Sequence, residues 1–213
     1  MSARVVALCL LALAAPASAA EITGRVVDAS GAPLPFAVVF VDALPPGVSP
    51  PSPPGKAMMD QVQKQFVPHV LPVVVGTEVS FPNHDQIHHH VYSFSRTKTF
   101  ELPLYKGEDA DPVVFDRTGA VKVGCNIHDW MSGIILVVPT PYFAMTDESG
   151  AFVFRDLPPG KYGILAWHER QKGAPEDVRQ EVTAGEATSP LTFTLDVAAP
   201  RSQPVRGGPR SYE

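Results

Sequence analysis

The sequence predicts an all-β protein. Short apolar runs rich in Val, Phe and Ile recur between turn residues, which is typical of β-strands. Proline and glycine are plentiful, at 23 and 16 of 213 residues. No long stretch has the periodicity of an amphipathic helix. These observations favour many short strands separated by turns.

The first residues have the composition of a secretory signal. Arg4 precedes an apolar run over residues 5–15, and Ala17-Ser18-Ala19 provides a small-residue cleavage site. Residues 1–20 are therefore predicted to be a signal peptide, and the mature protein is predicted to be periplasmic, with no membrane insertion. Cys9 lies inside the apolar run, so its removal leaves Cys125 unpaired, and an odd cysteine in an exported protein needs an explanation.

The charge balance limits the class of partner. The chain has 17 basic and 22 acidic side chains, a formal net charge of −5. This balance argues against nucleic acid and favours a basic protein partner. One candidate surface for steering such a partner is an acidic stretch, which equally suits a plain surface loop: Glu101, Glu108, Asp109, Asp111 and Asp116.

The strands of one predicted domain lie on both sides of the middle of the chain. Residues 22–27 and 36–41 are expected to form its first two strands, before a proline-rich linker at 44–55. Turn residues at 144–150 come before the later strands, which are expected at 151–154, 162–167, 178–182 and 191–195. Residues 198–213 lack an apolar period and are predicted to be a disordered tail.

Three phrases in this domain resemble the carboxypeptidase-regulatory-like, transthyretin-like β-sandwich family. They are Ile22-Thr23-Gly24-Arg25-Val26-Val27-Asp28, Thr146-Asp147-Glu148-Ser149-Gly150-Ala151-Phe152 and Leu157-Pro158-Pro159-Gly160-Lys161-Tyr162. The resemblance implies one discontinuous domain, residues 21–43 plus 143–197. A second domain, residues 58–140, is then inserted between its second and third strands, as is tolerable at an exposed loop whose ends lie close together.

The inserted segment has the pattern of short strands and turns that is typical of a small Greek-key sandwich. About eight short strands are expected in it. They are expected at 63–67, 70–75, 78–81, 89–94, 98–102, 112–115, 120–123 and 134–138.

A possible metal site lies between the last two of these strands. Gly124-Cys125-Asn126-Ile127-His128-Asp129-Trp130-Met131 has the spacing C-x2-H-x2-M, with all three ligand types on one tight loop. A thiolate and a thioether suit Cu(I), and an imidazole serves both copper oxidation states. Two histidines, a cysteine and a weak axial methionine form a blue-copper electron-transfer site, so a second histidine must come from a distant strand.

The histidine tract at residues 84–90 can supply that second histidine. Successive side chains of a strand point to opposite faces, and His89 shares its parity with Val91, so it is expected to point inward. Tyr92 and Phe94 are large and have the other parity, which leaves the assignment open. His89 is the first choice of ligand, His90 the second and His84 the third.

These motifs together resemble the cupredoxin (type 1 blue-copper) family. Val79-x-Phe81-x-Asn83 followed by His89-x-Val91, and then Gly124-Cys125-x-x-His128-x-x-Met131, carry the likeness. The short C-x2-H-x2-M spacing is most similar to amicyanin, and the longer sequence motif around it resembles cupredoxin-domain proteins of methylamine utilisation. In this sequence, His90 stands where an Asn commonly follows the strand histidine in that family. The resemblance implies one type 1 copper per chain, bound by His89, Cys125, His128 and Met131.

The function expected from these residues is electron transfer without catalysis. A periplasmic blue-copper protein would shuttle single electrons between a donor dehydrogenase and a c-type cytochrome or similar acceptor. The alternative is a copper-binding or copper-delivery protein that uses the histidine tract. A copper enzyme would need further centres, typically built from paired H-x-H motifs, and His88-x-His90 is the single H-x-H of this sequence. The role of the transthyretin-like domain is left open.

Overall fold

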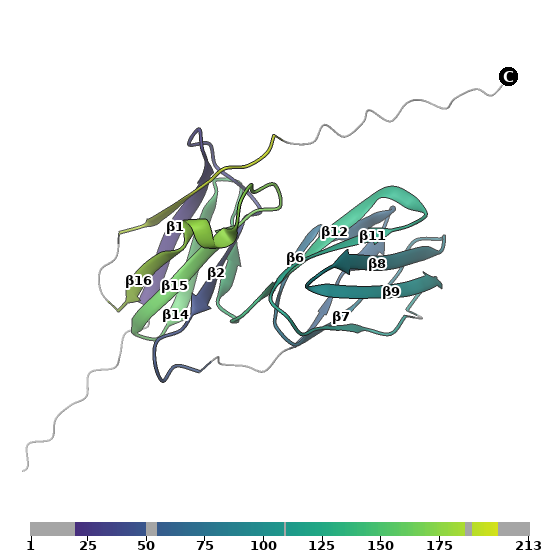
Figure 1. Cartoon of the computed structure of the whole chain (residues 1–213), viewed down its shortest axis with the longest axis horizontal. Coiled ribbons are helices and arrows are strands. Elements are labelled where there is room, and N and C mark those ends of the chain that lie inside the picture. Colours follow the sequence, from purple (N-terminus) through teal and green to yellow (C-terminus); the bar gives the residue numbers. More distant parts are fainter. Residues whose placement is uncertain (1–19, 50–54, 109, 186–188, 200–213) are drawn as a thin grey trace, which may run out of the picture.

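The prediction of an all-β fold is confirmed by a computed structural model, which describes residues 20–49, 55–108, 110–185 and 189–199. Two groups of strands lie side by side (Figure 1). The predicted signal peptide, apart from Ala20, lies outside the described residues, as do the centre of the proline-rich linker and most of the predicted tail. Within the described residues, no helix is long and apolar enough to span a membrane.

The first group is a sandwich of two sheets, formed by strands from residues 20–43 and 143–195. One sheet has the order β14-β1-β17 and the other β13-β2-β15-β16. Their core contains Val26, Val39, Phe152, Ile164 and Phe193 from strands of both sheets. The strands are β1 (Ala20–Asp28), β2 (Val38–Ala43), β13 (Phe143–Met145), β14 (Ala151–Leu157), β15 (Gly160–Trp167), β16 (Gln180–Ala184) and β17 (Leu191–Leu195).

Two expectations for this sandwich were wrong in detail. Residues 144–150 were expected to be a turn throughout, but Phe143–Met145 forms strand β13, because its backbone pairs with β2. Residues 178–182 were expected to be one strand, but Pro175–Val178 forms a short 3-10 helix, and β16 begins only at Gln180. Proline at the first helical position has its φ angle already set for such a turn.

The second group is also a sandwich, formed by residues 56–138. A five-stranded sheet of order β6-β12-β11-β8-β9 faces a three-stranded sheet of order β10-β7-β3, and a small hairpin β4-β5 lies beside them. The core between the sheets includes Val79, Val91, Phe115, Val121 and Ile135. The strands are β3 (Lys56–Met58), β4 (Asp60–Val62), β5 (Gln65–Val67), β6 (Val70–Val74), β7 (Thr77–Ser80), β8 (His89–Ser95), β9 (Lys98–Tyr105), β10 (Val113–Phe115), β11 (Gly119–Cys125) and β12 (His128–Val138).

A third apolar cluster joins the two sandwiches. Strand β12 is buried on both faces from Gly133 to Val138, and β15 is buried on both faces from Tyr162 to Trp167. Their outward side chains, with others from β2 and β6, form one cluster: Val38, Phe40, Val70, Ile134, Leu136, Val138, Leu165 and Trp167. Apolar runs without polar alternation are what strands buried on both faces require.

One glycine is expected to be essential to the first sandwich. Gly150 has a φ of +73°, and a Cβ added there would lie 2.5 Å from the carbonyl oxygen of Val26. Gly150→Ala is therefore expected to cost about 2 kcal/mol or more of unfolding free energy, measured by urea denaturation. Gly31→Ala is the matched control, since Gly31 also has a positive φ but nothing within 4 Å of the added Cβ. Equal losses in the two variants would contradict the steric explanation.

Candidate metal centre

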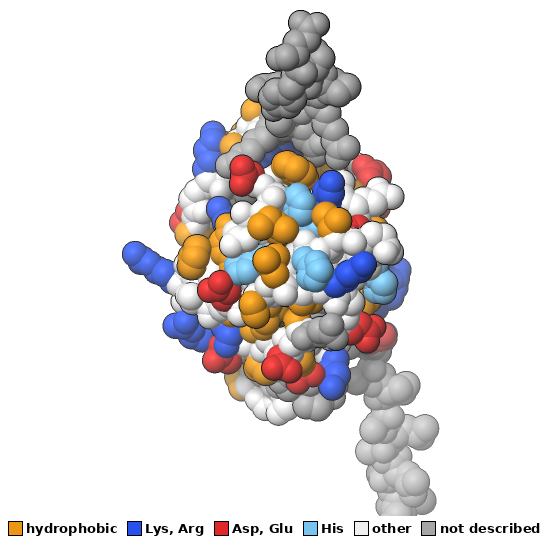
Figure 2. All heavy atoms as spheres, turned by 90° about the vertical axis from the view of Figure 1, so that its right-hand side faces the viewer, with side chains coloured by type: hydrophobic (Ala, Val, Ile, Leu, Met, Phe, Trp, Pro, Cys, Tyr) orange, Lys and Arg blue, Asp and Glu red, His pale blue; other side chains and the backbone are white. Residues whose placement is uncertain are grey.

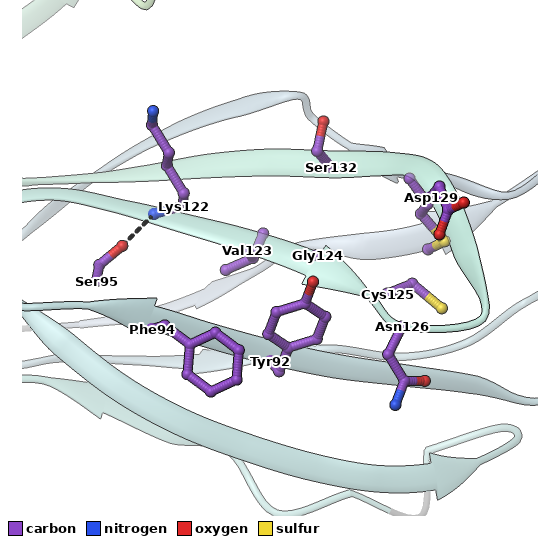
Figure 3. Close-up of a pocket in the computed structure, with 11 residues that line it drawn as sticks. Tyr92, Phe94, Ser95, Lys122, Val123, Gly124, Cys125, Asn126, Asp129 and Ser132 are labelled. Carbon is purple, nitrogen blue, oxygen red and sulfur yellow. Dashed lines mark hydrogen bonds between the residues drawn. The ribbon is translucent and has the colours of Figure 1, made fainter.

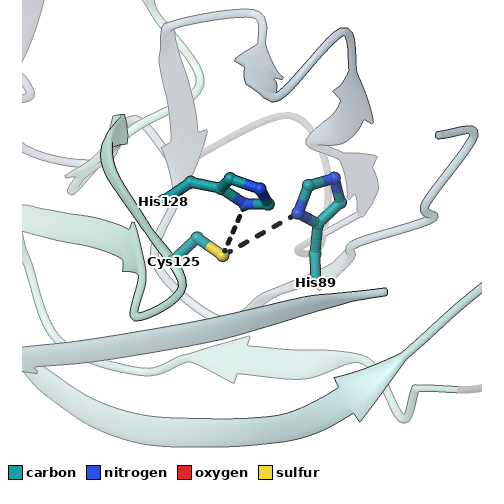
Figure 4. Close-up of side chains that lie close together, drawn as sticks. All are labelled: His89, Cys125 and His128. Atoms are coloured by element: carbon teal, nitrogen blue, oxygen red, sulfur yellow. Dashed lines mark hydrogen bonds between the residues drawn. The ribbon is translucent and has the colours of Figure 1, made fainter. Parts of the chain in front are cut away.

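Three strands of the inserted sandwich bring two imidazoles and a thiol together. His89 begins β8, Cys125 ends β11 and His128 begins β12. All three ligand types of the C-x2-H-x2-M motif were expected on one tight loop, but Cys125 lies in β11 and both His128 and Met131 lie in β12. Asn126 and Ile127 form the turn, with Cys125 opposite His128. Candidate ligands on paired strands are held more rigidly than ligands on a free loop. Figure 4 shows the three side chains pointing toward one another.

The donor atoms have the separations that one metal ion requires. The Sγ of Cys125 lies 3.8 Å from Nδ1 of His89 and 3.6 Å from Nδ1 of His128. All three donor atoms lie within 4.8 Å of one another. Bonds of about 2.0 Å to nitrogen and 2.3 Å to sulfur, at tetrahedral to trigonal angles, place the sulfur and a nitrogen about 3.5 to 3.7 Å apart. Both sulfur–nitrogen separations are therefore close to those of ligands that share one metal ion.

Met131, the fourth predicted ligand, is buried in the same core as Cys125, with 2% of its surface exposed. Both residues line the same surface hollow. His89 and Cys125 are buried as well, at 0% and 3% exposed, whereas His128 is partly exposed. The structure thus brings three of the four residues into contact and places the thioether nearby, and its role as axial ligand stays a prediction.

The orientation of His89 is fixed by a carboxylate behind it. Nε2 of His89 lies 2.7 Å from Oδ2 of Asp85 and donates to it. Asp85 also accepts hydrogen bonds from the backbone N–H groups of Gln63 (2.6 Å) and Lys64 (2.7 Å), both of which have positive φ angles in the β4–β5 turn. With its proton on Nε2, His89 directs the lone pair of Nδ1 toward Cys125.

Two residues at the centre have lowered pKa values. Burial lowers the pKa of His128, and the neighbouring His89 and Lys64 lower it further. Burial acts to raise the pKa of Asp85, but the hydrogen bonds from His89 and from the Lys64 and Gln63 amides outweigh it, so that this pKa is lowered. A neutral imidazole beside an ionised carboxylate is the arrangement that metal-binding histidines use.

The other histidines of the tract do not reach Cys125. His90 is buried, but its Nε2 contacts Oε1 of Glu101 at 2.8 Å, and its Nδ1 has no hydrogen-bond partner among the described residues. His84 is exposed, and its Nδ1 lies 2.8 Å from Oδ1 of Asp60. His88 is exposed. The inward parity expected for His89, Val91 and Ser93 agrees with their complete burial.

Two further histidines, His69 and His168, lie near the junction of the two sandwiches. Nδ1 of His69 lies 3.1 Å from the carbonyl oxygen of Ser132, and its Nε2 lies 2.8 Å from Oε2 of Glu169. Nδ1 of His168 accepts a hydrogen bond from the backbone N–H of Arg170. His69 therefore links a strand of the inserted sandwich to the loop after β15.

His84 and His168 are expected to titrate on opposite sides of the ordinary histidine pKa. The hydrogen bond and charge of Asp60 raise the pKa of His84, whereas burial and then the charge of Arg170 lower the pKa of His168. The contribution of His84 to stability is then present below about pH 6.5 and is lost as the pH rises through its raised pKa. That of His168 is present above about pH 6.5 and is lost as the pH falls. NMR titration of the imidazole Cε1 protons measures both values, and a His84 midpoint below that of His168 would contradict the assignment.

Sequence reasoning missed the residues that support the site. No role was predicted for Asp85 or for the buried pair Gln61 and Tyr105. Nε2 of Gln61 contacts the hydroxyl of Tyr105, which donates to the carbonyl oxygen of Phe81. Burial raises the pKa of Tyr105 to about 12. The spacing of Asp85 four residues before His89 was the one available signal.

Comparison with solved structures finds cupredoxins over part of the chain. A purple cupredoxin from Nitrosopumilus maritimus is 26% identical, with a TM-score of 0.34, over 38% of this chain and 98% of the other. A reduced amicyanin variant is 25% identical, with a TM-score of 0.36, over 42% of this chain and 96% of the other. A copper-containing nitrite reductase from Thermus scotoductus SA-01 is 26% identical, with a TM-score of 0.37, over 45% of this chain and 27% of the reductase.

No protein-family model and no curated protein sequence matches the chain. The three structures each cover less than half of the chain at low identity and low TM-score. The chemistry of the candidate centre therefore rests on its own residues, namely the thiol and two imidazoles that face one another.

Proposed function

We propose that this protein is a periplasmic electron carrier that binds one type 1 copper ion and has no catalytic activity of its own. The observation that carries this proposal is the group of Nδ1 of His89, Sγ of Cys125 and Nδ1 of His128, in which both sulfur–nitrogen separations are close to those of ligands that share one ion. A soft thiolate with two imidazoles suits copper in both oxidation states. A bound copper ion would supply a one-electron change between Cu(I) and Cu(II).

Each of the four residues has a distinct part in this proposal. Cys125 provides the thiolate, and His89 and His128 complete a trigonal plane around the ion. Met131, buried beside them, provides the weak axial thioether that tunes the reduction potential. Because the three strands and the Asp85 hydrogen bond hold these positions, we infer that little reorganisation accompanies electron transfer.

The exposed side of the centre offers a surface for a partner. His128 is partly exposed, and its ring lies 5.5 Å from the ring of Trp130, which is 64% exposed. Ile87 and Ile127 are also exposed, at 39% and 49%. Figure 2 shows hydrophobic and histidine side chains together on this end of the molecule. We infer that electrons pass through His128 to or from a redox protein docked here, with a dehydrogenase as donor and a c-type cytochrome as acceptor.

Copper titration of the mature protein tests this proposal. An intense visible charge-transfer band is expected to grow and to saturate at one Cu(II) per chain, because thiolate-to-copper charge transfer produces such a band. A protein that stays colourless with excess Cu(II) would overturn the proposal. Weak binding of several equivalents without the band would instead favour the alternative of copper delivery through the histidine tract, including His84, His88 and His90.

A further inference from the structure

A second surface, on the outer face of the five-stranded sheet, lies close to Cys125. Tyr92 and Phe94 of β8 point out of the sandwich, since His89, Val91 and Ser93 occupy the inward positions. Their rings lie 5.1 Å apart. Phe94 is 79% exposed, which is the largest exposure among the large hydrophobic side chains described. Because this aromatic pair points away from the core between the two sheets, core packing does not require it.

Tyr92 touches the backbone next to the proposed copper ligand. Strand β8 pairs with β11 so that Tyr92 lies opposite Gly124, the residue before Cys125. A Cβ added to Gly124 would lie 3.3 Å from Cζ and from the hydroxyl oxygen of Tyr92, so the ring covers this glycine directly. Figure 3 shows Tyr92 beside Gly124, with Phe94 further along the strand. One aromatic pair thus connects the Cys125 backbone with solvent.

The end of this surface around Phe94 is basic, although the chain as a whole is acidic. Lys122 lines the same hollow as Phe94, and its backbone N–H donates to Oγ of Ser95. The guanidinium of Arg117 donates to the backbone carbonyl oxygen of Arg96 at 2.7 Å, which fixes the Arg117 charge just beyond the end of β8, and Arg96 itself is exposed. None of these three cations forms an ion pair among the described residues, since Asp116 pairs with Lys98.

One carboxylate, Asp116, lies at this basic end and pairs with Lys98. The others lie further along the face: Glu101 is opposite Tyr92 on β9 and contacts His90, while Asp129 lines the hollow beyond Cys125. The face therefore has an exposed ring with more cations than carboxylates beside it. Two copies of this chain would bring like charges together if they met through this end, which argues against self-association here.

We propose that Tyr92, Phe94, Arg96, Arg117 and Lys122 form a docking surface for an acidic one-electron redox protein. This inference rests on the proposed function and adds a second partner site to the one around His128. The partner would gain the one electron that the bound copper loses, or the reverse, with no bond formed or broken and no proton moved. Because the two surfaces differ in charge and position, a donor and an acceptor can be distinguished by electrostatics.

A redox-inert anion tests where an acidic partner would dock. Hexacyanochromate(III) is paramagnetic, so it broadens the amide NMR signals of residues near which it binds. In the copper(I)-loaded protein at low ionic strength, the strongest broadening is expected at Phe94, Arg96 and Lys122. Strongest broadening at Ile127 and Asp129, or uniform weak broadening, would overturn the proposal. The metal-free protein is expected to give the same pattern, since the surface contains no ligand.

Charge reversal tests whether the surface matters for electron exchange. Lys122→Glu and Arg117→Glu are each expected to slow oxidation of the copper(I) protein by hexacyanoferrate(III) by about threefold or more at low ionic strength. Lys56→Glu is the matched control, because Lys56 is exposed on β3 of the other sheet and the change in charge is the same. Equal rates in Lys122→Glu, Arg117→Glu and Lys56→Glu would overturn the docking surface.

The two proposals fail in different ways. If the wild-type protein does not form the visible copper band, the electron-carrier function fails, while the anion map on the metal-free protein still decides the docking surface. If the band forms and the three charge variants behave alike, the carrier function stands and the second surface fails. An unchanged visible band in each variant confirms that the centre itself is intact.

Discussion

Cys125→Ser is expected to abolish the visible charge-transfer band and to reduce copper affinity by at least about 100-fold. Loss of an outer partner of a metal ligand already costs 10–100-fold in affinity, so loss of a ligand itself costs at least the upper part of that range. A serine hydroxyl is a hard, weakly acidic donor that does not replace a thiolate for Cu(I). The measurements are a visible spectrum and a competition titration with a copper chelator.

The control for this prediction is His88→Ala. His88 lies one residue from His89 but is exposed and outside the group of facing donors. It is expected to leave the band and the affinity unchanged, which separates the buried centre from loose binding by the histidine tract. Retention of copper and colour by Cys125→Ser would show that the thiol is not a ligand.

The inserted sandwich was largely predictable because its strands alternate. Val79, Val91 and Val121 are completely buried, and their chain neighbours are less so, as period-two patterns require. The same alternation made His89 the first choice of ligand and His90 the second, and His89 is the one that faces Cys125. Here the local pattern and the tertiary environment agree.

Parity alone could not show that His90 is also buried. Its ring lies on the outer face, where the neighbouring ring of Tyr92 and the carboxylate of Glu101 contact it. Burial of that kind depends on long side chains of an adjacent strand, which a period-two pattern does not describe. The junction between the sandwiches was missed for a related reason. Apolar runs in β12 and β15 indicate burial on both faces but do not identify what covers them.

The hydrogen bonds that orient His89 could not be predicted from the sequence, because they depend on tertiary contacts. Asp85 receives hydrogen bonds from Gln63 and Lys64, which are more than twenty residues away in sequence. The turn that presents these amides contains two non-glycine residues with positive φ, a conformation that the sequence did not signal. Spacing in the sequence therefore predicted the candidate metal donors, and the structure shows the hydrogen bond that orients one of them, His89.

Asp85→Asn is expected to lower copper affinity by about 10–100-fold and to raise the reduction potential. The amide can present its NH2 group to Nε2 of His89 and would then favour the tautomer with the proton on Nδ1, which removes the lone pair that faces Cys125. Loss of the carboxylate charge also makes the imidazole a weaker donor, and a weaker donor stabilises Cu(II) less than Cu(I). Chelator competition gives the affinity, and a redox titration of the visible band gives the potential.

Asp60→Asn is the matched control for Asp85→Asn, because both changes remove one carboxylate that contacts a histidine. Asp60 contacts the exposed His84, whereas Asp85 contacts the buried His89. The Asp60 variant is therefore expected to keep the affinity and the potential of the wild type, and to lower the pKa of His84 toward its ordinary value, because it removes the partner that raises it. If both variants bind copper as tightly as the wild type, at the same potential, His89 does not depend on Asp85 for its orientation.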